Sequence, residues 1–220
     1  MDNSNIEHGP KLWAEGLSLI QTDRIKAEHI LLKSEQIYEN NPINLHFTYN
    51  SLIELYRIRD TTDAKAKCLK YCKKDFKILS SLKSALLNEY PRAQNPLPRS
   101  MPSADILIRD YELRAEFKEA ILLCDNIISF GIDYFLNDKK RIQLKMQLSA
   151  EFDSYEEFAI EKVKNTVKNS PGINKGKLLE KLQSDNILLM EEAHKYLEEA
   201  ITRGIVKQEK KGRSLIHTVV

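Results

Sequence analysis

Glycine and proline are scarce in this chain of 220 residues, with seven of each. Loops that cradle phosphate groups depend on glycine, so the sequence has little material for a nucleotide-binding loop. It contains neither a P-loop nor a dinucleotide glycine fingerprint, and it lacks the H-E-x-x-H and G-x-S-x-G patterns. These absences predict a protein that is not an enzyme, has no catalytic residues and needs no cofactor.

Cysteine is also rare, with Cys68, Cys72 and Cys124 as the three copies. An odd number of cysteines without a Cys-x-x-Cys pair is typical of a reducing compartment. The first residues have no basic segment followed by an apolar one, so we expect no secretory signal. No apolar run approaches the length that a bilayer span requires. These features predict a cytoplasmic protein without a membrane partner.

Two of the cysteines share one face of a predicted helix. Cys68 and Cys72 stand four residues apart, and two such thiolates can hold zinc when two further ligands join them. His46 and Cys124 are the candidates for those ligands. Free cysteine is more often a small buried apolar residue, so we expect no metal site.

Neither sign of charge dominates the chain. It has 34 Lys and Arg residues against 32 Asp and Glu residues, a net formal charge of +2. A protein that coats nucleic acid through its overall charge is more basic than this. Any contact with DNA must therefore come from a local basic patch.

Helical periodicity is abundant. Apolar residues recur at intervals of three and four, and no strand pattern of period two precedes residue 205. Asp23, Thr61 and Ser103 are suitable N-caps. Prolines gather in the segment 89–102, which we expect to be either an exposed loop or a strap that docks in a groove or on a partner. The predicted helices cover residues 11–20, 24–39, 43–58, 61–88, 103–114, 117–130 and 140–150.

Two stretches of this helical part share one template. Residues 49–56 read Y-x-x-L-I-x-x-Y, and residues 104–111 read A-x-x-L-I-x-x-Y. Over residues 11–131 the pattern resembles the tetratricopeptide repeat, whose first helix reads W-x-x-L-G-x-x-Y. The chain departs from that family where Lys65 and Ile108 stand in place of small residues. The resemblance implies antiparallel helical hairpins that stack and leave a concave groove.

The same resemblance implies a protein or peptide partner in that groove. Amide and guanidinium groups on the first helix of each hairpin bind peptide backbone or carboxylates. The alternative is that these side chains are ordinary solvated residues. The partner-binding residues expected on this basis are Tyr49, Asn50, Arg57 and Arg109.

The last part of the chain has a different order of elements. Predicted helices over 155–169, 174–182 and 189–203 precede strands over 205–209 and 214–220. Gly204 suits a helix stop with positive φ, and Gly212 suits a hairpin turn. This order resembles the winged helix-turn-helix family. We therefore expect a mainly α protein with two domains, a tetratricopeptide-like domain over 1–150 and a winged helix with a small β-hairpin over 151–220.

In the winged-helix family the third helix enters the major groove and the hairpin contacts neighbouring phosphates. The third helix conflicts with that role, because Glu191, Glu192, Glu198 and Glu199 are all expected to face outward and carboxylates repel phosphates. The basic hairpin favours DNA nonetheless. The resemblance implies double-stranded DNA bound by Asn174, Lys175, Lys177, Lys195, Lys207, Lys210, Lys211 and Arg213.

Two functions stay open on the sequence. The first is a DNA-binding regulator of transcription whose helical repeats bind a protein or peptide partner. The second is an adaptor or scaffold whose winged helix mediates protein assembly. In domain order the chain also resembles the PCI-type subunits of the proteasome lid, which supports the second. A homo-oligomer is compatible with both.

Overall fold

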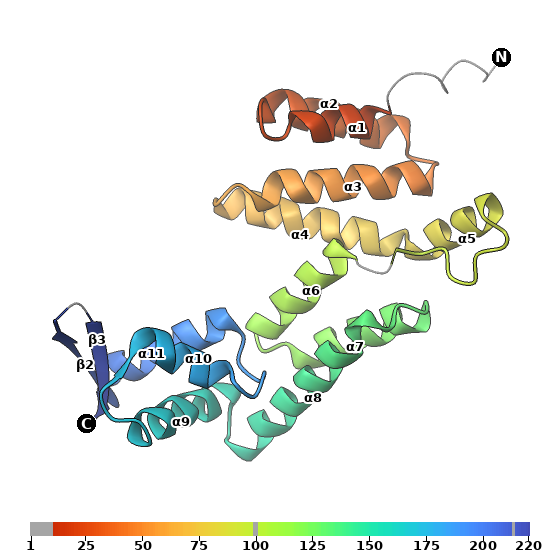
Figure 1. Cartoon of the computed structure of the whole chain (residues 1–220). Helices are drawn as coiled ribbons and strands as arrows, with labels where there is room; N and C mark the ends of the chain where they lie inside the picture. The colour runs from red at the N-terminus through yellow and green to blue at the C-terminus, as the bar shows by residue number, and fades with distance from the viewer. Residues whose placement is uncertain (1–10, 99–100, 213) are drawn as a thin grey trace, which may run out of the picture. The chain divides into compact units, whose positions relative to one another are not determined.

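The computed structural model describes residues 11–98, 101–212 and 214–220. These residues form eleven α-helices and one small antiparallel sheet, so the predicted mainly α fold is confirmed (Figure 1). The described residues divide into two compact units, one up to residue 110 together with 126–134, the other comprising 111–125 and 135–220. The division passes through α6 (Pro102–Leu113) and α7 (Phe117–Ser129). The expected domain limit at residue 150 stays a prediction.

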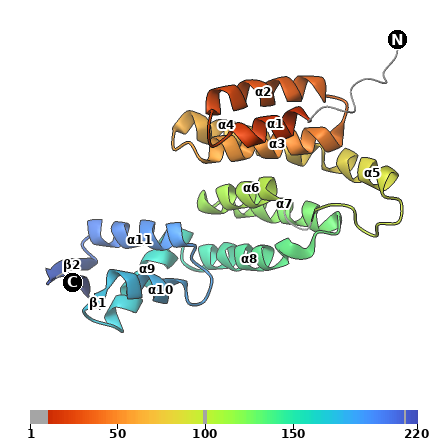
Figure 2. The same cartoon turned by 45° about the horizontal axis from the view of Figure 1, so that its top comes forward.

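The first unit begins with helices that pack against their neighbours in the chain. Helix α1 packs against α2, α2 against α3, and α3 against α4 (Figure 2). Their joint core includes Leu31, Leu52 and Leu55, which are fully buried. The repeat interpretation of these helices stays a prediction. The bounds are α1 (Leu12–Leu19), α2 (Arg24–Ile37), α3 (Pro42–Arg57), α4 (Thr62–Lys77) and α5 (Leu79–Glu89).

Side-chain caps explain where several of these helices begin. The side chain of Asp23 accepts a hydrogen bond from Lys26 N, and that of Thr61 accepts one from Ala64 N, as predicted. The prediction for Ser103 is wrong, because α6 begins one residue earlier, at Pro102. The Ser103 hydroxyl instead donates to buried Asp75 at 2.6 Å.

Two helix predictions need correction. The helix expected over 61–88 is broken at Ile78, where the chain has φ −87° and ψ 0° and turns so that Leu79 and Leu82 become buried. The helix expected over 140–150 extends over Leu136–Glu151 as α8, directly after a 3-10 turn at Asp133–Phe135.

The proline-rich segment is non-helical in its described part, as expected. Most of its side chains are exposed, but Leu97 is buried. The Asn95 amide donates to the carbonyl oxygen of Gly131 at 2.7 Å. The segment is therefore fastened to the end of α7 at two points.

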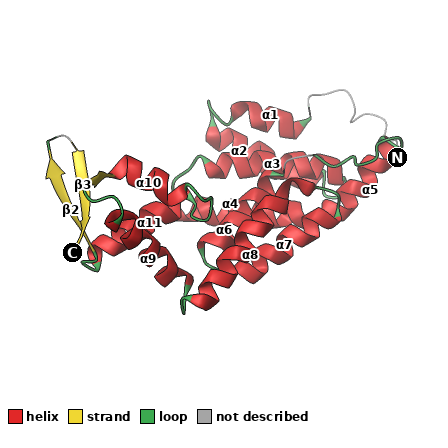
Figure 3. Ribbon diagram, turned by 60° about the horizontal axis from the view of Figure 1, so that its bottom comes forward, coloured by secondary structure: helices red, strands yellow, loops and turns green. Residues whose placement is uncertain are grey.

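The second unit contains all three strands found in the described residues (Figure 3). Strand β3 lies in the middle of the sheet, in the order β1-β3-β2, and both pairings are antiparallel. The β2–β3 hairpin was predicted and β1 was not, because two residues are too few to show a period. The elements after α8 are α9 (Tyr155–Lys168), β1 (Ile173–Asn174), α10 (Lys175–Gln183), α11 (Met190–Thr202), β2 (Val206–Lys211) and β3 (Ser214–Val219).

Two glycines and one histidine set the geometry around this sheet. Gly204 has φ +70° just after α11, and Gly212 has φ +62° between β2 and β3, as predicted for a helix stop and a turn. His217 on β3 is fully buried. Its Nδ1 lies 3.2 Å from the carbonyl oxygen of Ile173, and its Nε2 lies 2.9 Å from the Gln208 amide. The imidazole thus ties the central strand to both neighbours.

Candidate functional site

The residues expected to bind DNA lie on α10, on α11 and along the hairpin. Asn174 has a structural task at the start of α10, where its side-chain oxygen accepts a hydrogen bond from Lys177 N at 3.0 Å. An N-cap satisfies one of the backbone donors that a helix start leaves unpaired. The amide oxygen of Asn174 is therefore already in use.

Three of the expected lysines have interactions within the chain. Lys175 forms an ion pair with Glu198 at 2.8 Å, and Lys207 forms one with Glu209 at 2.8 Å. The ammonium group of Lys195 lies 4.7 Å from the centre of the Tyr196 ring. A cation with a nearby carboxylate offers less net charge to a phosphate, so these lysines are weaker candidates than the sequence alone indicates.

Lys177, Lys210 and Lys211 are different. All three are exposed, and none has an ion-pair partner among the described residues. Lys210 and Lys211 stand opposite Leu215 and Ser214 at the tip of the hairpin. Arg213, expected beside them, lies outside the described residues. The hairpin tip therefore presents unneutralised positive charge.

The acidic residues of α11 are arranged differently from the expectation. Glu192 does not face outward, because its side chain is only 2% exposed. Glu198 is paired with Lys175, and Glu199 is paired with Arg203 at 2.7 Å. Glu191 is exposed and also has an interaction partner. The helix thus presents less free negative charge than its sequence suggests.

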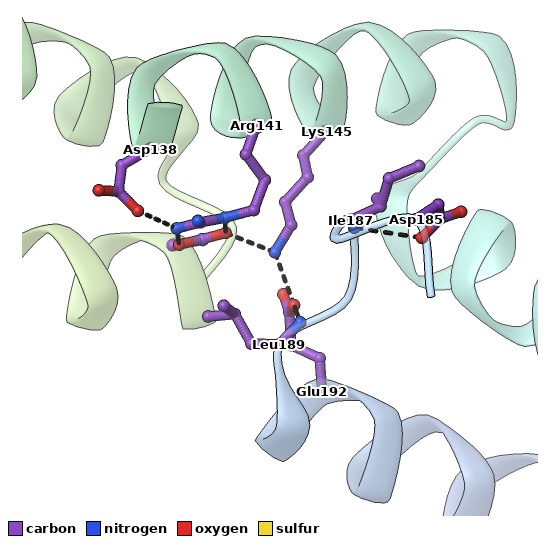
Figure 4. A network of polar contacts seen from close by, with 8 residues as sticks. Asp138, Arg141, Lys145, Asp185, Ile187, Leu189 and Glu192 are labelled. Atoms are coloured by element: carbon purple, nitrogen blue, oxygen red, sulfur yellow. Dashed lines mark hydrogen bonds and ion pairs between the residues drawn. The ribbon is translucent and has the colours of Figure 1, made fainter. Parts of the chain in front are cut away.

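Buried Glu192 belongs to a network that links three helices. The Lys145 ammonium of α8 lies 2.6 Å from Glu192 Oε2 and 2.6 Å from Glu112 Oε1 of α6. Figure 4 shows Lys145 reaching across to Glu192, which also accepts the backbone N–H of Leu189 at 2.7 Å. Arg141 donates through Nε and Nη2 to both oxygens of Glu112 at 2.9 Å each. Both carboxylates are thus held by cations on α8.

The two carboxylates of this network differ in their proton affinity. Burial raises the pKa of Glu112, but hydrogen bonds from Arg141 and the charge of Lys145 outweigh burial and hold that pKa below its usual value. Burial also raises the pKa of Glu192, and there Lys145 and the Leu189 backbone only partly offset it. The difference follows from the geometry, because Glu112 has two cations and Glu192 has one.

The residues expected to bind a peptide partner mostly serve the first unit itself. Tyr49 is 7% exposed, and burial together with Glu35 raises its pKa to about 12. The Asn50 amide donates to the carbonyl oxygen of His46 at 2.9 Å. Arg57 is exposed but pairs with Glu54 at 2.7 Å. Arg109 is exposed on α6 and has an interaction partner.

An aromatic pair on α1 and α3 was missed by the sequence interpretation. The rings of Trp13 and Phe47 stack with their centres 4.6 Å apart and an interplanar angle of 18°. Phe47 is 41% exposed, and the Trp13 indole donates to the Asn44 side chain at 3.3 Å. A single tryptophan in the chain was the available signal for a partner surface, since exposed aromatic residues are enriched at interfaces.

The cysteines lie inside the first and second units. Cys68, Cys72 and Cys124 are all buried, and the Cys68 thiol is 3.8 Å from the carbonyl oxygen of Ile53. Burial raises the pKa of Cys124 to about 12. Within the described ranges, His, Cys, Asp and Glu side chains form no group of three that could hold a metal ion. Nor does any helix in the described part of the chain have the length and apolarity to cross a membrane.

Comparisons with protein-family models, with curated proteins and with solved structures found no match to this chain.

Proposed function

We propose that residues 151–220 form a winged helix that binds duplex DNA in a cytoplasmic, non-enzymatic regulator of transcription, while the helical part binds a protein or peptide partner. The order of elements supports the fold. Helix α9, strand β1, helices α10 and α11, and the hairpin β2–β3 follow the winged-helix sequence of elements, with β3 central in the sheet. Strand β1 between the first two helices strengthens the resemblance beyond the predicted hairpin.

The observation that carries the DNA proposal is the free positive charge of Lys177, Lys210 and Lys211. Each is exposed and has no carboxylate partner among the described residues. In the winged-helix family the hairpin lies against the DNA backbone, where lysines replace counterions and gain affinity. The buried position of Glu192 and the pairing of Glu198 with Lys175 reduce the repulsion expected from α11.

A charge-removal experiment tests this function. In Lys210→Ala with Lys211→Ala, we expect weaker binding to all duplex sequences by about the same factor, since phosphate contacts carry no sequence information. Lys140→Ala is the matched control, because Lys140 is exposed on α8 and unpaired in the described part of the chain. If both variants bind DNA as the parent does, the hairpin does not contact the backbone.

An adaptor is the second candidate, and the Trp13–Phe47 stack favours it. An exposed stacked pair of aromatic rings is suited to an apolar partner surface. Phe47→Ala should weaken capture of such a partner and leave DNA binding unchanged. Loss of assembly after deletion of 151–220, in a parent that does not bind DNA, would favour the adaptor over the regulator.

A further inference from the structure

The buried surroundings of Lys145 contain two polar atoms that lack a hydrogen-bond partner among the described residues. They are Glu192 Oε1 on α11 and the hydroxyl oxygen of Tyr155 on α9. Both side chains are almost fully buried, at 2% and 3% exposure. Buried polar atoms in native proteins are nearly always paired, so two unpaired atoms in one place require an explanation.

The unequal use of the Glu192 carboxylate shows where the strain of this arrangement lies. Its Oε2 accepts two hydrogen bonds, from the Lys145 ammonium at 2.6 Å and from Leu189 N at 2.7 Å. Its Oε1 accepts none within the described ranges. A carboxylate has acceptor sites on both oxygens, so Glu192 has one oxygen to offer to a further donor.

Tyr155 is a suitable donor. The Lys145 ammonium lies 5.1 Å from the centre of the Tyr155 ring, so the phenol and the carboxylate surround the same cation. The ring also packs edge-on against Tyr196 of α11 at 6.1 Å. Burial, with the nearby charge of Glu192, raises the pKa of Tyr155, so the phenol keeps its proton at neutral pH.

We propose that Lys145, Glu192 and Tyr155 are positioning residues for α11, and that the Tyr155 hydroxyl donates to Glu192 Oε1 when α11 engages DNA. The proposal rests on the DNA-binding function. Lys145 holds the first turn of the helix to α8, because Glu192 is at its third position and also caps Leu189 N. The additional bond to α9 fixes that turn from a second side. DNA binding thereby closes a contact that the free protein leaves open.

Tyr155→Phe is a mild test of this proposal. The substitution removes one oxygen and keeps the ring that packs against Phe117, Phe158 and Tyr196. The free variant should be at least as stable as the parent, because a buried unpaired hydroxyl is lost. Its affinity for duplex DNA should fall about tenfold, the effect of losing one hydrogen bond to a charged acceptor. Tyr196→Phe, the same change on α11, should bind as the parent does.

Hydrogen exchange gives a second readout that stability alone would not move. In the parent, DNA should slow exchange of the amides in the first turn of α11 about tenfold more than in Tyr155→Phe. Binding by Tyr155→Phe within twofold of the parent would overturn the latch and leave the DNA function standing. A Tyr155→Phe protein that unfolds more easily would also overturn it, since the hydroxyl would then have a partner in the free state. A parent that binds no DNA would remove both proposals together.

Discussion

Replacing Lys145 with methionine is the perturbation whose cost the structure specifies best. Lys145 is completely buried between two carboxylates, each 2.6 Å away. After Lys145→Met, Glu112 keeps both hydrogen bonds from Arg141, whereas Glu192 keeps only the backbone N–H of Leu189. Removing one partner of a buried ion pair usually costs about 3–5 kcal/mol, because the other charge stays buried without compensation.

Protonation of Glu192 limits that cost and makes it depend on pH. An unfolded glutamate has a pKa of about 4.3, and each pH unit above it adds about 1.4 kcal/mol to the free energy of keeping the carboxyl protonated. The limit is therefore about 4 kcal/mol at pH 7 and about 1 kcal/mol at pH 5. Adding Glu192→Gln should restore most of the stability at pH 7, because the neutral amide can still accept from Leu189 N.

Urea unfolding followed by far-ultraviolet circular dichroism at pH 5 and pH 7 measures both values. Lys164→Met is the control in the same unit, because Lys164 pairs with Glu161 on the surface and such pairs contribute about 0–1 kcal/mol. A loss below about 1 kcal/mol at pH 7, or a loss equal at the two pH values, would refute the reasoning.

Two further predictions concern close packing and acid stability. Gly16→Ala on α1 should destabilise the first unit by about 1–3 kcal/mol in a thermal melt despite the better helix propensity of alanine, because its Cβ would lie 2.6 Å from the side chain of fully buried Leu31; an unchanged or higher melting temperature would show that Leu31 can move. Since the pKa of Glu112 is lowered on folding, its contribution to stability is present above pH 4.5 and is lost as pH falls through the folded pKa. Glu112→Gln should therefore flatten the acid limb of a stability curve below pH 4.5, and a limb as steep as in the parent would contradict this.

Hydrophobic periodicity predicted the helices well because they are long and strongly patterned. The break at Ile78 could not be predicted, since no glycine or proline marks it and tertiary burial of Leu79 and Leu82 decides it. Strand β1 was missed because two residues carry no pattern. Tyr111 was expected to face a neighbouring helix, yet it is only half-buried.

The candidate site was less predictable because charge pairing is a tertiary property. Glu192 was placed outside by helix period, but its partner Lys145 comes from another helix 47 residues away. A signal was present, since Lys145 stands three residues after fully buried Ile142 on the same helical face. A charge in the middle of an apolar stripe indicates a buried pair, although the sequence does not say with which residue. Asn174 was likewise chosen for DNA and caps α10 instead.

The measurement that tests the central claim most directly is the salt dependence of binding to random-sequence duplex DNA by the parent chain. With Lys177, Lys210 and Lys211 on phosphates, the logarithm of the association constant should fall linearly with the logarithm of salt concentration, with a slope of about −3 from roughly −0.9 per contact. Alanine at all three positions should bring that slope close to zero. A parent that shows no salt-dependent binding at low ionic strength, or a triple variant with an unchanged slope, would contradict the DNA-binding account.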